Sequence, residues 1–210
     1  MIATKVIREK IAELPAGEFF TPSLFAGMGS RATIDMALIR LAKEGQVERI
    51  GRGLYVLPKS SRFGIKTMPA AEQIAKVVAE AEGAVVAMHG AEATRRLGLS
   101  TQMSTQPVFY TNGTSRNIRV GKLLIRLKHV AARKMLLAGR PAGKALSVLW
   151  YLGSYEVESS TFKRIAQKLP LSEFKALWEA KPSMLGWMAE AMNRYEEEID
   201  TKNKLPLEDI

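Results

Sequence analysis

The chain has 210 residues, 47% hydrophobic and 25% charged, which is ordinary for a globular protein with room for one large or two small domains. It has no cysteine, which excludes disulfides and thiolate metal sites, and it shows neither a signal-peptide core nor an apolar run approaching the roughly 18 residues of a membrane span. The net charge of +10 favours an anionic partner, and we expect a cytoplasmic protein.

The positive charge is concentrated in the first two thirds of the chain. Residues 1–66 carry 11 Lys and Arg against 6 Asp and Glu, and residues 67–153 carry 12 against 4. Residues 154–210 carry 8 against 11. We therefore expect nucleic acid to meet the first two blocks, although basic residues that only aid solubility would give the same composition.

Residues 1–60 are predicted to form a winged helix-turn-helix domain. An amphipathic helix at 4–14 begins it, and a shorter helix follows. A glycine turn at 27–29 then leads to a further helix, which Ser30 caps and Gly45 ends. This helix is the element around which we expect the domain to be organised.

That helix has one apolar and one basic side. Ile34, Leu38 and Leu41 recur at intervals of four and three, as the buried side of an amphipathic helix requires. The side chains that then point outward are Thr33, Met36, Arg40 and Lys43. A helix with such an outer side can enter the major groove of DNA and reach base edges.

Two β-rich runs, at 46–50 and 54–57, flank the tip Gly51-Arg52-Gly53 and predict a hairpin with a basic end. A hairpin beside the helix can lay an arginine against phosphates or into a minor groove. The candidate DNA contacts are Ser30, Arg31, Thr33, Met36, Arg40, Lys43, Arg49 and Arg52. We expect Asp35, one turn from Arg31, to hold that arginine rather than touch DNA. The alternatives are an amphipathic helix packed on a hairpin with ordinary solvated charges, and a winged helix that serves as a protein-docking module.

A polar linker is predicted at 61–69, followed at 70–200 by a mixed α/β domain with a small antiparallel sheet and C-terminal helices. Residues 201–210 are expected to be a flexible tail. The fold class is therefore α+β. Two strands joined at Gly121-Lys122 predict a hairpin, and in its second strand Arg126 and Lys128 alternate with Ile125 and Leu127. Candidate secondary nucleic-acid contacts in the sheet are Arg116, Arg119, Arg126 and Lys128. This basic face of the sheet is equally well explained as the solvated side of a half-buried sheet.

The C-terminal helices are rich in methionine and tryptophan. The residues that recur at helical spacing are Trp178, Met184, Trp187, Met188 and Met192. They are interpreted either as a core or as a surface for a protein partner.

No catalytic constellation emerges from the sequence. The two histidines, His89 and His129, lie far apart without acidic neighbours at metal-ligand spacing, so we expect no metal site. Residues 139–144 resemble a phosphate loop only superficially, because the glycine spacing is too short and Ala145 replaces the metal-binding hydroxyl. We predict no enzymatic activity and no cofactor.

With these residues in view, the chain resembles the AbiEi-type antitoxins of type IV toxin–antitoxin systems. The resemblance covers roughly residues 5–152, in the family's order and approximate spacing. The segments that carry it are Gly29–Leu38, Arg49–Val56, Leu97–Gln102, Pro107–Arg116 and Leu137–Gly143.

The resemblance implies a non-enzymatic transcriptional autorepressor of an abortive-infection system. Its winged helix would bind repeated operator sequences in double-stranded DNA at its own promoter, as a monomer or a dimer. Its second domain would counteract a nucleotidyltransferase-like toxin. The alternative is a protein-binding or RNA-binding module that uses the basic sheet of the second domain without sequence-specific DNA binding.

Overall fold

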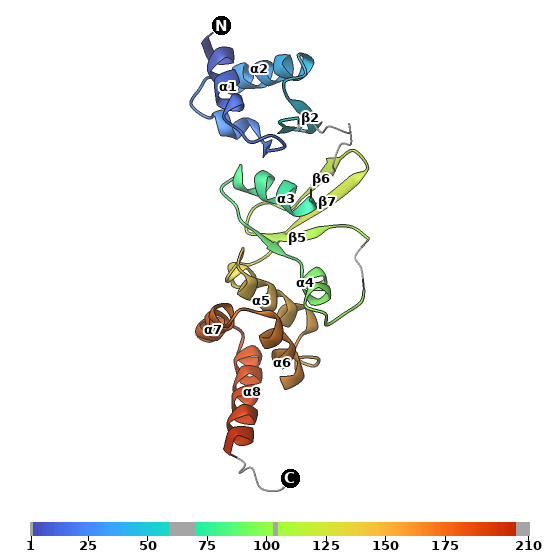
Figure 1. The fold of residues 1–210 in the computed structure, drawn as a ribbon, viewed down its shortest axis with the longest axis vertical. Coiled ribbons are helices and arrows are strands. Elements are labelled where there is room, and N and C mark those ends of the chain that lie inside the picture. Colours follow the sequence, from blue (N-terminus) through green and yellow to red (C-terminus); the bar gives the residue numbers. More distant parts are fainter. Residues whose placement is uncertain (1, 59–69, 103–104, 205–210) are drawn as a thin grey trace. The chain divides into compact units, whose positions relative to one another are not determined.

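The computed structural model describes residues 2–58, 70–102 and 105–204 (Figure 1). Within these ranges the chain forms eight α-helices, three short 3-10 helices and seven strands. Every strand pair with an assigned register is antiparallel. The expected α+β class is therefore confirmed.

The chain divides into two compact units. The first comprises Met1–Val85 and Gly113–Leu127, and the second comprises Val86–Asn112 and Lys128–Ile210. The linker predicted at 61–69 lies outside the described residues, so the domain boundary placed there stays a prediction.

The first unit begins with helices and a three-stranded sheet. In chain order its elements are α1 (Ile2–Ala12), β1 (Phe19–Phe20), η1 (Pro22–Phe25), α2 (Arg31–Lys43), β2 (Glu48–Gly51) and β3 (Leu54–Val56). The strands lie in the order β1-β3-β2, with Tyr55 opposite Phe20 on one side and Arg49 on the other. The hairpin is as predicted, whereas the short helix is a 3-10 turn and β1 was not expected.

A buried apolar core joins α1, α2 and this sheet. Ile34, Leu38 and Leu41 are at most 3% exposed, which confirms the predicted buried side of the second helix. The core is completed mainly by Ile7, Ile11, Phe20, Phe25, Val47 and Tyr55. Full burial of one such side chain contributes about 1.5–3 kcal/mol. The core therefore fixes which side of α2 faces solvent.

The first unit also contains one helix and a second hairpin. These elements are α3 (Ala71–Glu80), β6 (Arg116–Val120) and β7 (Leu123–His129), which continues into the second unit. Ile118 lies opposite Ile125, and Gly121, with φ of +57°, allows the two-residue turn. Ile125 and Leu127 are buried while Arg126 is exposed, so the predicted alternation of this strand is confirmed.

The second unit contains two paired strands and most of the helices. Its elements are β4 (Val86–Met88), α4 (Gly90–Arg96), β5 (Val108–Thr111), η2 (Ala132–Met135), α5 (Pro141–Leu152), α6 (Ser159–Lys168), α7 (Leu171–Glu179), η3 (Lys181–Ser183) and α8 (Gly186–Lys204). β4 and β5 pair with Ala87 opposite Tyr110. A Cβ atom at Gly90 would lie 2.4 Å from the Cβ of Tyr151, so only glycine permits this close approach of α4 to α5.

The helices α6, α7 and α8 gather beside α5 around one apolar core (Figure 1). Met188 and Met192 are fully buried in it, and Met184 is 8% exposed. The interpretation of the methionines as core is therefore confirmed. α8 continues to Lys204 and includes the start of the predicted tail, and residues 205–210 lie outside the described part of the chain.

Candidate nucleic-acid interface

The first turn of α2 is held by two side-chain interactions. The hydroxyl of Ser30 accepts a hydrogen bond from the backbone N–H of Thr33 at 3.2 Å, and the two hydroxyl oxygens lie 2.8 Å apart. One turn on, Arg31 Nε donates to both carboxylate oxygens of Asp35 at 3.1 and 3.0 Å. The predicted cap and the predicted Arg31–Asp35 pair are both confirmed. Ser30, Arg31 and Thr33 are exposed but oriented by these neighbours.

The outer side of α2 combines apolar and cationic side chains. Met36 is 52% exposed, Arg40 and Lys43 are exposed, and Ile39, which was not predicted, is 38% exposed. Arg40 and Lys43 form no ion pair or hydrogen bond with any residue that the structure describes. Ile39 lies three positions after Met36, so the helical period could have revealed it.

The hairpin β2–β3 presents two arginines. Arg49 Nε donates to the backbone carbonyl of Gly51 at 3.3 Å, where the register of the two strands shifts. Arg52 lies exposed at the tip, and none of the described residues pairs with it. Gly53, with φ of +66°, allows the tight turn that places Arg52 there. Arg49 is thus anchored on the strand, whereas Arg52 is free at its end.

Tyr55 connects the hairpin to the start of α2 and was missed by the sequence reasoning. Its ring is 3% exposed and stacks on Phe20 with the ring centroids 5.9 Å apart. Burial raises the pKa of the Tyr55 hydroxyl, and the charges that act on it next are those of Arg49, Asp35 and Arg31. The neutral phenol therefore lies among the charged groups at the base of this interface. The signal was the hairpin register, which places Tyr55 opposite Arg49.

A groove of about 570 Å³ runs between α2 and β2. Lys43 and Ile39 line it from the helix, and Arg49 and Glu48 line it from the strand. Two cations on its two walls suit a phosphate group of a nucleic-acid backbone. The groove therefore links the predicted helix contacts to the predicted hairpin contacts.

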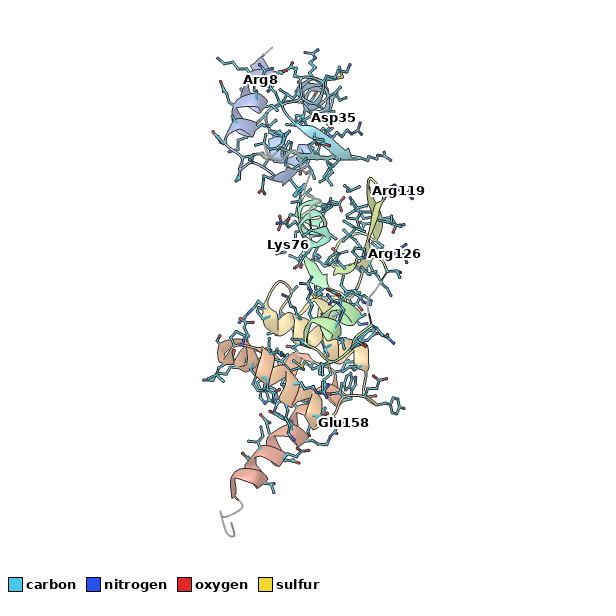
Figure 2. All side chains as sticks on the ribbon, turned by 45° about the vertical axis from the view of Figure 1, so that its right-hand side comes forward. Arg8, Asp35, Lys76, Arg119, Arg126 and Glu158 are labelled. Atoms are coloured by element: carbon cyan, nitrogen blue, oxygen red, sulfur yellow. The ribbon has the colours of Figure 1, made fainter. Side chains whose placement is uncertain are left out.

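The candidate secondary contacts divide into two groups. Arg119 and Arg126 are exposed on one side of the hairpin β6–β7, the side turned away from α3 (Figure 2). Lys128 is exposed two residues after Arg126 on the same strand and therefore lies on the same side. Arg116 lies on the opposite side, is half-buried and forms an ion pair with Glu82. Three of the four candidates thus share one side of the sheet.

The segment that resembles a phosphate loop is filled by the protein itself. The backbone N–H of Ala142 donates to Glu173 at 3.1 Å, and Arg140 bonds the same carboxylate at 3.0 Å. Arg140 first, and then this N–H, lower the pKa of Glu173. A Cβ atom at Gly143 would lie 2.1 Å from the carbonyl oxygen of Leu137, so packing accounts for this glycine. A carboxylate occupies the donor that a bound phosphate would need.

The described residues contain neither a cluster of metal ligands nor a membrane-spanning helix. In that part of the chain, no group of three or more His, Asp or Glu side chains is placed to hold a metal ion. No helix in the same ranges has the length and apolar character to cross a membrane.

Comparison with known proteins gives one match. The family model of DUF6088, described as a family of unknown function, matches residues 6–177. The match spans α2, both hairpins and the second unit as far as α7. Neither the curated proteins nor the solved structures contain a match to the chain.

Proposed function

This chain belongs to the DUF6088 family, and we propose that it is a DNA-binding transcriptional regulator that represses its own operon. The observation that carries the proposal is the exposed basic side of α2 beside the free arginine at the tip of an adjacent hairpin. Helix, glycine turn, second helix and hairpin are the parts of a winged helix-turn-helix, with α2 as the recognition helix and Arg52 on the wing. The net charge of +10 supports an anionic partner.

The candidate contacts fall into two roles. Arg40, Lys43 and Arg52 are unpaired cations among the described residues and would bind mainly phosphate. Arg31, Thr33 and Met36 lie on the first half of α2, the part that reaches base edges when such a helix docks, and would read sequence. Asp35 would hold the Arg31 guanidinium in one orientation before DNA arrives.

The second role that we propose is that of an antitoxin in a type IV, abortive-infection system. Its support is the resemblance to the AbiEi-type antitoxins, which extends into the second unit. In this role the protein is not an enzyme and counteracts a nucleotidyltransferase-like toxin through protein or nucleic-acid contacts. The filled loop at Ala142, where a carboxylate holds the backbone donor, accords with a role without nucleotide chemistry.

A reporter gene joined to the DNA upstream of this protein's own gene tests the regulatory role. The wild-type protein should lower expression, and Arg40→Ala should restore it because one phosphate contact of α2 is lost. Arg164→Ala, which removes an exposed arginine of α6, is the matched control and should still repress. Repression by Arg40→Ala at the wild-type level, with equal protein amounts, would refute the role assigned to α2.

Co-expression with the product of the neighbouring gene tests the antitoxin role separately. If that product arrests growth, the wild-type protein should restore growth, and so should Arg40→Ala, which keeps the second unit intact. Growth arrest that the wild-type protein fails to relieve would contradict the antitoxin role and leave the repressor role standing.

The rival function is a protein-binding or RNA-binding module without operator specificity. The observation that favours it is the exposed side of the hairpin β6–β7, which presents Arg119 and Arg126. Under this alternative, Arg126→Ala would weaken binding to structured RNA or to an acidic protein, while Arg40→Ala would have no effect. Measuring both variants against duplex DNA and structured RNA separates the two functions.

A further inference from the structure

A cluster of aromatic rings in the second unit surrounds His89. The His89 ring lies 4.8 Å from that of Tyr110 and 6.2 Å from that of Tyr151, measured between centroids. Tyr110 is buried, whereas Tyr151 is 46% exposed and His89 is half-buried. The cluster therefore reaches the surface through His89 and Tyr151. Tyr110 also packs in a small apolar core with Ala87, Val130 and Met135, whereas His89 and Tyr151 belong neither to that core nor to the proposed DNA interface.

The hydrogen bonding of His89 fixes its tautomer and leaves one donor available. Its Nδ1 accepts the backbone N–H of Ala91 at 3.3 Å at the start of α4. The neutral ring must then carry its proton on Nε2. No described residue accepts a hydrogen bond from that atom, and it is not among the buried unsatisfied atoms. Nε2–H is thus a free donor at the edge of the cluster.

Two lysines act electrostatically on the His89 ring. Lys128 is exposed, and Lys134 Nζ lies 4.6 Å from the centroid of the Trp150 ring. Neither forms an ion pair with a described carboxylate. Burial first, and then Lys128 and Lys134, lower the pKa of His89. An anion bound near the His89 ring would offset the positive charge of the two lysines.

We propose that His89, Tyr151, Lys128 and Lys134 form a binding site for a nucleotide with an unpaired base. The exposed Tyr151 ring offers a face for stacking, which is sequence-tolerant because every base has a flat face. The two lysines meet the phosphate, and His89 Nε2–H donates to the base or sugar. A paired base inside a duplex cannot reach such a site, so this inference is independent of the proposed operator binding.

The nucleotide can be free or part of a single strand, and the two sources share this chemistry. Titration of the full-length protein with adenosine monophosphate, a short oligouridine and inorganic phosphate distinguishes them. The histidine NMR signals report on the site, because the chain has two histidines and the variant His129→Gln assigns the signal of His89. Either nucleotide probe should shift that signal, and the tighter-binding probe identifies the source.

Tyr151→Leu should weaken nucleotide binding about tenfold, because it removes the stacking face while keeping the atoms that pack on Gly90. Tyr155→Leu, which removes a 99% exposed ring outside the cluster, is its control. Lys128→Gln should also weaken binding, and Lys122→Gln, an exposed lysine at the turn of the same hairpin, should not. Thermal unfolding of each variant checks the fold.

Three results would overturn the proposal. A shift of the His89 signal by inorganic phosphate as large as that by either nucleotide would mean a site for simple anions. A folded Tyr151→Leu variant that binds like the wild type would exclude stacking. No shift with any probe at low salt would exclude the site.

Discussion

Arginine and lysine serve different purposes in α2 with its hairpin and in α4. The cations of the first region that have no partner among the described residues are Arg40, Lys43 and Arg52. In α4, Glu92 instead accepts hydrogen bonds from Arg95 at 2.7 and 2.8 Å and from Arg96 at 2.8 Å. Both regions count as basic in the sequence. Only the first has cations without a carboxylate partner among the described residues.

Pairing, rather than the number of basic residues, therefore identifies a surface ready for an anion. A cation held by a carboxylate must give up that partner before it can bind phosphate, whereas a free cation only releases solvent and counterions. Arg31, held by Asp35 yet 69% exposed, lies between these two cases. The following variants test the distinction.

The largest effect is expected when two free cations are removed together. Each phosphate contact should contribute about eightfold in affinity between 1 M and 0.1 M salt, so Arg40→Ala with Arg52→Ala should lose roughly 60-fold at the lower salt. The slope of log affinity against log salt should fall by about 2. Fluorescence anisotropy on labelled upstream DNA measures both, with Arg95→Ala as the paired-arginine control. An equally large loss of DNA affinity with Arg95→Ala would show that paired and free arginines do not differ in DNA binding.

Met36→Ala should reduce sequence preference with little change in the salt dependence, because the lost contact is apolar. The expected loss is about 1 kcal/mol, or roughly fivefold, for upstream DNA and nothing for a shuffled duplex. Leu24→Ala, which removes a leucine 39% exposed outside α2, is the control. An equal loss of affinity for both duplexes would show that Met36 does not contact base edges.

Glu92→Gln should affect stability and leave DNA binding unchanged. Hydrogen bonds from Arg95 first, and then from Arg96, lower the pKa of Glu92 from 4.5 to about 2. Because the folded-state pKa is depressed, the stabilisation is fully present above pH 4.5 and is lost as the pH falls toward 2. We expect the variant to lose about 1 kcal/mol near pH 7.

Urea unfolding at pH 3, 5 and 7 measures this difference, with Glu80→Gln, an exposed glutamate of α3, as the control. A difference between wild type and Glu92→Gln that is constant over this pH range would mean that the charge of Glu92 is unimportant.

Asp35→Asn should have the smallest effect. Loss of the exposed Arg31–Asp35 pair should cost about 0.3–0.5 kcal/mol of stability. Removal of a negative charge should raise affinity for any duplex slightly, while the released Arg31 should lower the preference for upstream DNA. Competition between upstream and shuffled duplexes measures this preference. An increased preference would show that Asp35 opposes Arg31 in recognition.

The spacing of apolar residues was sufficient to predict the elements in which that spacing repeats several times. It placed the buried side of α2, the two hairpins and the methionine core of α8, because burial follows regular spacing. It could not reveal β1, whose two residues carry no period. The short helix predicted before Gly27 is a 3-10 helix, because the few residues between Pro22 and the glycine turn leave no room for a longer helix.

The candidate site was predictable where partners lie one turn apart. The pairs of Ser30 with Thr33 and of Arg31 with Asp35 follow from helical spacing. Glu82, the ion-pair partner of Arg116, lies in the turn after α3, and no local sequence pattern connects that turn to the sheet. The hairpin register places Tyr55 opposite Arg49, whereas the stacking of its ring on Phe20 required the pairing of β1 with β3.

The most direct measurement is a binding titration of the wild-type protein against the DNA upstream of its own gene and against a shuffled duplex, at several salt concentrations. The proposal predicts tighter binding to the upstream DNA at every salt concentration, with affinity for both duplexes falling steeply as salt rises. Equal, weak binding to the two duplexes would contradict sequence-specific repression and leave the exposed cations of α2 as a nonspecific charge.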